Sequence, residues 1–265
     1  MTENSSFIYF DNAKSGLLYD DSSHPTFPLR YYNVADGEGY SPCKSCSYYG
    51  FVYSGAVSIT TDERTPEMWL TKGMYFSTAG ALEINGNGSV ILIEVLHKKG
   101  IYPQNNYSAM RMFGGPIEEQ GRLKYIDGCT DSLLIPPVKM GDPCFNHLHF
   151  PANIDQTPHT HPSNRIGMVS KGNGECITPF GNLPLFEGMI FIIKEWDGVS
   201  FDKGLDGKTY PTGTHSFRTF EEEGMDVIAF HPDSDFGATD EIHPMINRTI
   251  VNGVSASKID SIRTK

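Results

Sequence analysis

The chain has 265 residues, 12% of them aromatic, and a formal net charge of −11. Such an acidic chain is a poor partner for nucleic acid or for an anionic membrane surface, because both attract clustered lysine and arginine. The 27 glycines and 17 prolines, together with few helix-period runs, indicate an all-β protein with many turns. A chain of this length can bury a sizeable core in one or two domains.

The first residues contain neither the basic nor the apolar region of a secretory signal peptide, and no apolar run is long enough to span a bilayer. The five cysteines are odd in number and scattered, which predicts reduced thiols in a cytoplasmic protein. Cys43 and Cys46 form a single CxxC pair. Without a second pair or a thioredoxin-like βαβ pattern, this pair predicts neither a zinc site nor a redox site.

An internal repeat divides the chain into two similar halves. The segments Val52–Ile59 and Lys72–Phe76 have counterparts in Val169–Ile177 and Glu187–Ile193. In each copy a strand-like run reaches a turn glycine, and a Gly-Met pair follows at a similar distance. We interpret the repeat as two tandem β-barrels, because a second barrel can cover the edges and ends of the first.

Three histidines are the main candidates for a functional site. His159 and His161 alternate with one threonine, and alternate residues of an extended strand face the same side. A third histidine, His215, follows in the run YPTGTHSF. Imidazole is the commonest protein ligand for transition metals, so the sequence offers three nitrogens that could converge on one ion.

The run NIDQTPHTHPSNRIGMVSKG resembles the first motif of the cupin superfamily, G-x5-HxH-x3-E-x6-G. His159 and His161 match the HxH pair, and Gly172 matches the closing glycine. Asn153 occupies the opening glycine position, which is a mild change because asparagine tolerates positive φ. Arg165 occupies the position of the family's ligand glutamate.

The second cupin motif ends in PxGxxH-x3-N, and it is met loosely by Pro211, Gly213 and His215, with Thr219 at the asparagine position. The resemblance implies an all-β fold of tandem cupin barrels, that is, jelly-roll or double-stranded β-helix barrels. The chain as a whole therefore resembles two-barrel cupins, or bicupins, among bacterial cupin-domain proteins.

The resemblance and the repeat together predict two domains. Residues 1–125 are expected to form a degenerate, metal-free N-terminal barrel, and residues 126–265 a C-terminal barrel with the metal site. Aligning the halves places Tyr48 over Arg165 and Glu83 in the slot of the second-motif histidine. Because neither slot holds a histidine, only the C-terminal barrel is expected to bind an ion.

The three-histidine set implies one divalent transition metal, namely Fe, Mn, Ni, Cu or Zn, with open positions for water or substrate. Arg165 cannot be a ligand, because a guanidinium stays protonated. We expect it to clamp an anionic ligand, and the alternative is a buried ion pair with an acidic residue of the barrel. A further alternative is that His159 and His161 are hydrogen-bonded in a barrel without an ion.

Other histidines carry weaker signals. His147 and His149 form a second same-face pair, which predicts either a substitute ligand or general base, or a structural role. His231 and His243 lie beside prolines, and a structural role is favoured for both. The aromatic-rich insertion at 194–214 is expected to be either a lid over the barrel or a subunit contact.

Two classes of function follow. The first is a metalloenzyme acting on a small, anionic molecule, and the resemblance implies an oxygenase, such as a dioxygenase, ahead of an isomerase or lyase. The second is a non-catalytic binding or sensor protein for a small ligand. Neither class requires nucleic acid or a membrane, and a homo-oligomer is compatible with both. Fold alone does not decide between them.

Overall fold

The computed structural model describes residues 2–10, 14–40, 43, 45–61, 66–96, 111–138, 141–233, 250–251 and 254–255. Within them the regular structure is β-strand apart from one short 3-10 turn, Ile126–Gly128. No helix in these ranges has the length and apolar character needed to cross a bilayer. His243 lies outside the described residues, so the structure does not test its predicted role.

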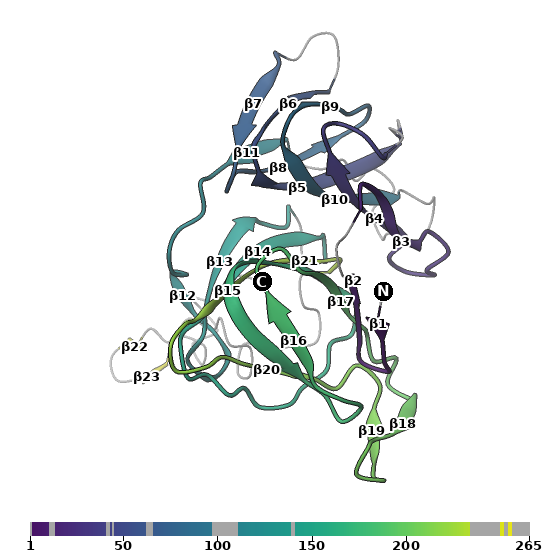
Figure 1. The fold of residues 1–265 in the computed structure, drawn as a ribbon, viewed down its shortest axis with the longest axis vertical. Helices are drawn as coiled ribbons and strands as arrows, with labels where there is room; N and C mark the ends of the chain where they lie inside the picture. The colour runs from purple at the N-terminus through teal and green to yellow at the C-terminus, as the bar shows by residue number, and fades with distance from the viewer. Residues whose placement is uncertain are drawn as a thin grey trace.

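The N-terminal unit, at the top of Figure 1, is made of two sheets. The strand order in the larger sheet is β11-β8-β5-β10-β4-β3, and in the smaller it is β7-β6-β9. The strands are β3 (Gly16–Asp21), β4 (Leu29–Ala35), β5 (Cys46–Ser54), β6 (Ala56–Thr60), β7 (Met68–Thr71), β8 (Tyr75–Ala79), β9 (Glu83–Gly86), β10 (Ser89–Leu96) and β11 (Met112–Gly114).

The C-terminal unit, below it in Figure 1, is built on a ten-stranded sheet. Eight strands follow the order β1-β2-β17-β15-β21-β14-β13-β12, while β16 and β20 pair with the second half of β15. The strands are β1 (Thr2–Glu3), β2 (Phe7–Phe10), β12 (Leu123–Lys124), β13 (Thr130–Ile135), β14 (Cys144–Phe150), β15 (Arg165–Ile177), β16 (Leu183–Phe186), β17 (Ile190–Ile193), β20 (Ser216–Arg218) and β21 (Met225–His231). Two hairpins complete the fold, β18 (Phe201–Lys203) with β19 (Thr209–Pro211) and β22 (Ile250–Val251) with β23 (Val254–Ser255).

The first strands of the chain belong to the C-terminal sheet. β2 pairs antiparallel with β17, so that Phe7 lies opposite Ile193. The chain passes from the first unit to the second between Gly114, which pairs with β8, and Leu123, which pairs with β13. The predicted division between residues 125 and 126 stays a prediction, and one segment, residues 2–10, lies on the far side of it.

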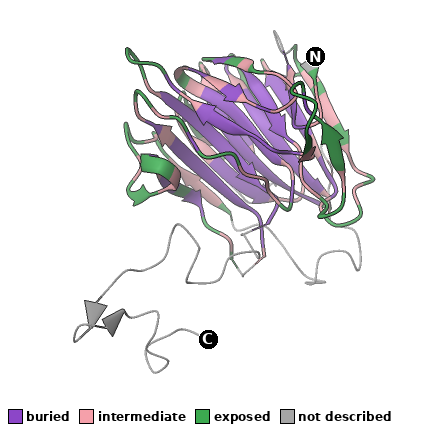
Figure 2. Ribbon diagram, turned by 90° about the horizontal axis from the view of Figure 1, so that it is seen from below, coloured by how far each residue is buried: buried purple, intermediate pink, exposed green. Residues whose placement is uncertain are grey.

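There are three hydrophobic cores, one inside each unit and one between the two units. β10 shows how they are built, because both of its faces are buried. Val90 and Leu92 point into the N-terminal barrel, whereas Ile91, Ile93 and Val95 join the core between the two units. Because side chains alternate between the two faces of a strand, one apolar run on β10 fills the barrel interior with one face and the core between the units with the other. The buried strands stack across the molecule in Figure 2.

The predicted internal repeat is confirmed by equivalent hydrogen bonds. The N–H of Val52 donates to the carbonyl of Met74 at 2.9 Å, and the N–H of Val169 donates to that of Met189 at the same distance. The glycine before each methionine donates back to the same valine at 2.8 Å. The two halves therefore fold through the same turn, although few of their other residues agree.

The turn glycine Gly172 allows a direct stability test. Its φ is +75°, and a Cβ there would lie 2.0 Å from the carbonyl oxygen of Gly224. We expect Gly172→Ala to lower the free energy of unfolding by about 2 kcal/mol or more, because both the backbone strain and the contact oppose it. Gly188→Ala is the matched control, since φ is +87° but no atom lies within 4 Å. Urea unfolding of the two variants measures the destabilisation that the contact with Gly224 adds to the backbone strain. Equal losses of unfolding free energy in both variants would show that the contact adds nothing.

The structure corrects the prediction that all five cysteines are reduced. Cys43 and Cys46 are joined by a disulfide with a Cα–Cα distance of 5.5 Å. The free cysteines among the described residues are Cys129, Cys144 and Cys176, and all three are buried. The CxxC spacing places the two sulfur atoms close enough for this bond.

Candidate metal centre

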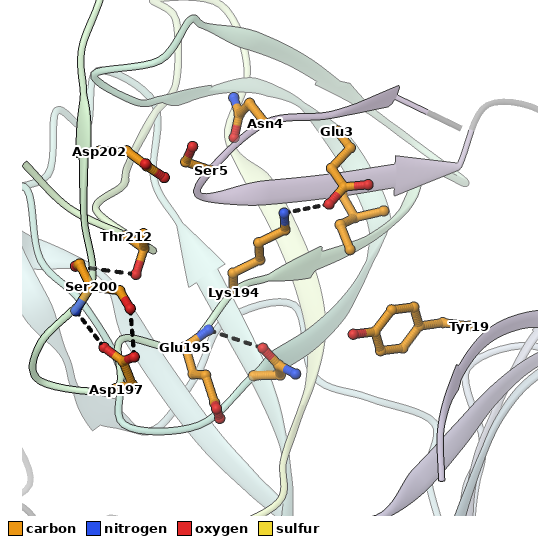
Figure 3. A pocket seen from close by; sticks show the side chains of 12 residues that line it. Glu3, Asn4, Ser5, Tyr19, Lys194, Glu195, Asp197, Ser200, Asp202 and Thr212 are labelled. Atoms are coloured by element: carbon orange, nitrogen blue, oxygen red, sulfur yellow. Dashed lines mark hydrogen bonds and ion pairs between the residues drawn. The ribbon is translucent and has the colours of Figure 1, made fainter. Parts of the chain in front are cut away.

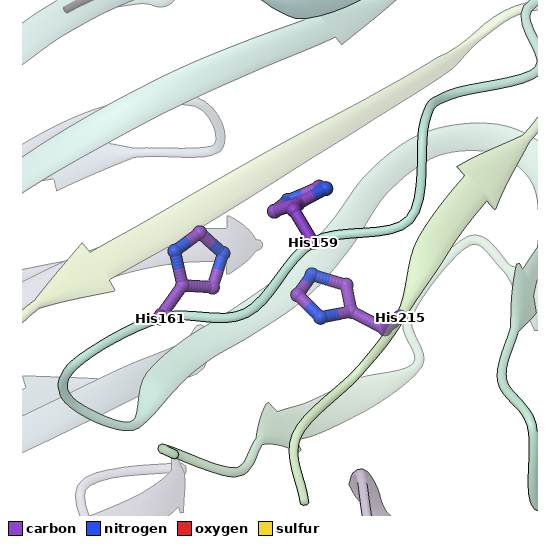
Figure 4. Close-up of side chains that lie close together, drawn as sticks. All are labelled: His159, His161 and His215. Carbon is purple, nitrogen blue, oxygen red and sulfur yellow. The ribbon is translucent and has the colours of Figure 1, made fainter. Parts of the chain in front are cut away.

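Two separate segments of the C-terminal barrel carry the three histidines. His159 and His161 lie on the extended segment before β15, and His215 immediately precedes β20. His159 and His215 form an isolated antiparallel bridge, with N···O distances of 2.9 and 3.0 Å. Figure 4 shows the three imidazoles turned toward one another from these two segments. Backbone pairing therefore brings together residues that lie more than fifty positions apart.

Two left-handed residues shape the segments. Asn153, at the position of the first-motif glycine, has a φ of 63°, as the sequence analysis allowed. Gly213 has a φ of +76°, and a Cβ there would lie 2.3 Å from the carbonyl oxygen of Lys194. Only glycine fits the turn that delivers His215 to the bridge.

The three rings are close enough to share one ion. Their centroids are separated by 5.0 Å for His159 and His161, 4.5 Å for His159 and His215, and 5.1 Å for His161 and His215. One nitrogen from each ring lies within 4.8 Å of the other two. Nitrogens that each bind an ion at about 2.0–2.1 Å must lie within about 4 Å of one another, so modest side-chain rotations suffice.

Backbone carbonyls orient two of the rings. Nδ1 of His159 donates to the carbonyl of Thr157, and Nδ1 of His215 donates to that of Gly213, both at 2.9 Å. A carbonyl can only accept, so Nε2 of each ring presents its lone pair. Nε2 of His215 is buried and has no hydrogen-bond partner in the described structure. A buried acceptor with no partner, beside two other imidazoles, fits a metal ion.

The histidines are neutral, as metal ligands must be. Burial lowers the pKa of His159, and it lowers the pKa of His161 well below the usual histidine value. Burial, with the nearby His159, lowers the pKa of His215 to about 3. The guanidinium of Arg165 adds to the effect at each ring, because it repels a second positive charge.

The cavity beside the histidines is small and mostly apolar. Its volume is about 30 Å³, which suits an ion or a water molecule. None of the described lining residues is an aspartate or glutamate. Its polar groups other than the three histidines include Arg165, His231 and Gln156. The walls include Leu148, Phe150, Phe191, Ile193, Phe217 and Val227.

Arg165 begins β15 and is buried at the cavity wall. Its Nη1 donates to Oδ1 of Asp233 at 3.0 Å and to the hydroxyl of Ser163 at 2.5 Å. Asp233 is itself buried. The geometry thus favours the alternative that the sequence analysis kept open, a buried ion pair, while the anion clamp stays a prediction.

Sequence reasoning missed His231 as a cavity residue. It ends β21, where Val227, Ala229 and His231 alternate into the barrel interior. Its Nδ1 lies 3.3 Å from Nδ2 of Asn146, an amide nitrogen that donates, so Nε2 of His231 carries the proton. Burial lowers the pKa of His231 well below its usual value, and the side chain is neutral. The alternation on β21 was the signal that could have placed it here.

His147 and His149 do not reach the cavity. Nε2 of His147 and Nδ1 of His149 both lie close to Oδ1 of Asp226, at 3.1 and 2.7 Å. Burial opposes ionisation of this carboxyl, but the hydrogen bonds from both histidines outweigh it and lower the pKa of Asp226. The pair is therefore a structural feature of β14 and β21, not a substitute ligand.

This cluster predicts a pH-dependent contribution to stability. Because the pKa of Asp226 is lowered on folding, its carboxylate stabilises the native state above the ordinary value of 3.8, and the effect is lost as the pH falls through the lowered pKa. We expect Asp226→Asn to be less stable than the native protein near pH 7, and the difference to shrink below about pH 4. Urea unfolding of both proteins across this range tests it. A constant difference would show that the carboxylate's charge is irrelevant.

The insertion does not cover the histidine cavity, because no residue of 194–214 lines it. Instead it borders a larger, open hollow of about 730 Å³ together with Glu3 and Tyr19, as Figure 3 shows. Two carboxylates of the hollow have local partners: Glu3 pairs with Lys194, and Asp197 accepts from Ser200. Among the residues that the structure describes, no set of converging metal donors lies in this hollow, so the smaller cavity is the better candidate site.

The described part of the N-terminal barrel has no counterpart of the histidine triad. In the C-terminal barrel Ile177 pairs with Ser216, the residue after His215. In the N-terminal barrel the matching pair is Thr60 and Glu83, so Leu82 takes the place of the histidine. Leu82 is fully buried in the barrel core, whereas Glu83 is exposed. The prediction that Glu83 corresponds to His215 was thus wrong by one residue. In a strand, a shift of one residue turns the side chain to the opposite face of the sheet.

No family model matches the sequence, and no curated protein matches it. Among solved structures, the chain is similar to the protein Ylba from E. coli, with 12% identity over 90% of this chain and 96% of that chain and a TM-score of 0.59. A cupin 2 conserved barrel domain protein from Leptotrichia buccalis matches with 12% identity over 88% and 92% of the two chains and a TM-score of 0.52.

A third neighbour is an enzyme. The salicylate 1,2-dioxygenase from Pseudaminobacter salicylatoxidans matches with 12% identity over 83% of this chain and 76% of that chain, with a TM-score of 0.53. Identities this low carry the fold and no more. Because such neighbours cover most of the chain, the predicted all-β class is confirmed, and the chain has the cupin fold of tandem barrels.

Proposed function

We propose that this protein is a metal-dependent enzyme that binds one divalent transition metal through His159, His161 and His215 and oxidises a small anionic molecule. The observation that carries the proposal is the unpartnered Nε2 of buried His215, beside two further neutral imidazoles. Two rings are already fixed by carbonyls in the tautomer that leaves Nε2 free. Fixing a ring in this way is the usual support for a metal-binding histidine.

When bound, the metal would supply Lewis acidity and, as iron or manganese, redox chemistry. Three neutral imidazoles leave the charge of a divalent ion uncompensated, and no carboxylate lies in the described cavity lining. This charge favours an anionic ligand, because the ion would be the largest local charge in a dry site. The anion preference thus has a physical basis that does not require a free Arg165.

The chain's own residues would prepare the site. Nε2–H of neutral His231 is placed to donate a hydrogen bond into the cavity, since Asn146 fixes its tautomer. The Arg165–Asp233 pair holds the start of β15, next to the histidine segment, without adding net charge. The apolar walls exclude water and strengthen each electrostatic interaction inside.

The proposal is tested with metal-free protein reloaded with Fe²⁺, Mn²⁺ or Zn²⁺ in separate samples. X-ray absorption should show metal–nitrogen distances near 2.0–2.1 Å. Oxygen uptake is then measured with small aromatic carboxylates, beginning with salicylate and gentisate, and metal-free protein is the control. Metal-dependent uptake supports the enzyme, and failure to bind any of the three ions overturns the metal site.

A non-catalytic binding or sensor protein is the second candidate. The observation that favours it is the described cavity lining, which contains no aspartate or glutamate that could act as a general base. A sensor would bind its ligand with metal present but consume no oxygen. Calorimetric titration of the same carboxylates, alongside the uptake assay, separates the two functions.

A further inference from the structure

The interior of the N-terminal barrel contains a buried acidic residue. On β10, Glu94 shares the inward face with Val90 and Leu92, and only 1% of it is exposed. Its Oε1 accepts from Nη1 of Arg30 at 3.0 Å, and its Oε2 accepts from the hydroxyl of Tyr48 at 3.0 Å. A carboxylate buried among apolar side chains is costly unless it is paired, and its placement therefore calls for an explanation.

Glu94 occupies the position that corresponds to a cavity residue of the other barrel. Tyr49 pairs with Ile93 in the N-terminal sheet, and Ile166 pairs with Phe230 in the C-terminal sheet. By the repeat, Tyr48 corresponds to Arg165, so Glu94 corresponds to His231. The carboxylate thus lies at the end of its barrel that matches the histidine site.

Two sulfur atoms lie beside this carboxylate. The Sγ atoms of Cys43 and Cys46 and a carboxylate oxygen of Glu94 all lie within 4.8 Å of one another. Cys46 is buried at the start of β5, while Cys43 is partly exposed and its N–H donates to the Tyr48 hydroxyl at 2.6 Å. The disulfide is therefore reachable from solvent at Cys43, and on its other side it lies beside the Glu94 carboxylate and the Tyr48 hydroxyl.

A buried hydroxyl adds to the polar lining. Thr78 lies directly opposite Tyr48 in the register of β8 and β5, so both side chains face the interior. Its Oγ1 is buried and has no hydrogen-bond partner in the described structure. Thr78, Tyr48 and Glu94 thus form a polar row across three adjacent strands. An unpaired polar atom here fits a water molecule or ligand at this end of the barrel.

We propose that Cys43, Cys46 and Glu94 form a second metal site that is open only when the disulfide is reduced. Two thiolates and a carboxylate suit Zn²⁺, and a fourth position would be left for water. Arg30 and Tyr48 would orient the carboxylate, since each leaves a lone pair free on the oxygen it contacts. This site is independent of the histidine centre.

Reduction by a dithiol opens the site by ordinary exchange. The Cys43–Cys46 bond breaks, a cyclic disulfide forms in the dithiol, and its two protons pass to the two cysteine sulfurs. Zn²⁺ binding then releases these protons to solvent. Oxidation of the two thiolates by a disulfide reverses the process and expels the ion.

Cobalt(II) is the probe, because thiolate ligands give Co²⁺ an intense near-ultraviolet charge-transfer band that histidine and carboxylate ligands do not give. Full-length protein is reduced with a dithiol, freed of it without oxygen, and titrated with Co²⁺. We expect a band that saturates within about two equivalents in reduced protein, because the proposed histidine centre also takes up Co²⁺, and that is absent from oxidised protein. Glu94→Gln should weaken this binding by about tenfold or more.

Cys43→Ser should abolish the band, and Cys144→Ser, a buried cysteine elsewhere, is the matched control and should retain it. Circular dichroism confirms that each variant is folded. No thiolate band in reduced native protein overturns the proposal without reference to any variant. A band of full strength in Cys43→Ser overturns it as well, because a different cysteine would then be the ligand.

Discussion

Replacing His161 by alanine is expected to abolish stoichiometric metal binding in the C-terminal barrel while both barrels stay folded. The change removes one of three nitrogens that converge within 4.8 Å, and two imidazoles alone leave the ion mostly hydrated. Loss of a supporting group around a metal costs about 10–100-fold in affinity, so loss of a ligand should cost about 100-fold or more. Metal content after dialysis, with the disulfide closed, measures the effect.

His149→Ala is the matched control for this test. His149 belongs to the HxH pair on β14, and its ring contacts Asp226 rather than the cavity. We expect this variant to retain about one ion per chain. Undiminished metal content in His161→Ala would refute the assignment, and loss of the ion in His149→Ala would restore the substitute-ligand interpretation.

The second large effect is expected at Arg165. Arg165→Glu should lower the free energy of unfolding by at least about 3 kcal/mol, because it leaves two buried carboxylates together where an ion pair stood. The same change at Arg218, whose pairing with Glu175 is partly exposed, should cost about 1 kcal/mol or less. Urea unfolding of both variants gives the comparison.

The same variant decides the role of Arg165 in the site. The introduced carboxylate would stand at the family's ligand position. If metal affinity rises while the fold is kept, Arg165 is a clamp whose removal restores a four-ligand centre. If the fold is lost and metal binding is no tighter, the side chain is scaffolding. The buried pair with Asp233 leads us to expect the second result.

The sequence predicted the features that depend on local spacing. The HxH alternation and the loop glycine were enough to name His159, His161 and His215, and the structure brings all three together. The turn glycines of the repeat carry positive φ in both halves, and this requirement survives when most other residues change. Positions where the backbone needs a positive φ can therefore be predicted from the glycines of a single sequence.

Features that depend on register or on distant partners were not predictable. Asp233, the partner of Arg165, lies 68 positions away, and nothing in the spacing links them. The alignment of Glu83 missed by one residue, because a loop of different length precedes each second motif and a strand reverses its face at every step. The disulfide was also misjudged, since an odd number of cysteines does not exclude a bond between two of them.

Residues that precede β2 contact the loop that carries His215. Gly213 N–H donates to the carbonyl of Ser5 at 3.0 Å, and the hydroxyl of Ser6 donates to the carbonyl of Thr214 at 2.7 Å. The loop that carries His215 is thus braced by residues 5 and 6. A fragment beginning at residue 126 would lack this brace and expose the edge of β17. The barrels are therefore not interchangeable modules, because the strands β1 and β2 complete the sheet of the C-terminal barrel.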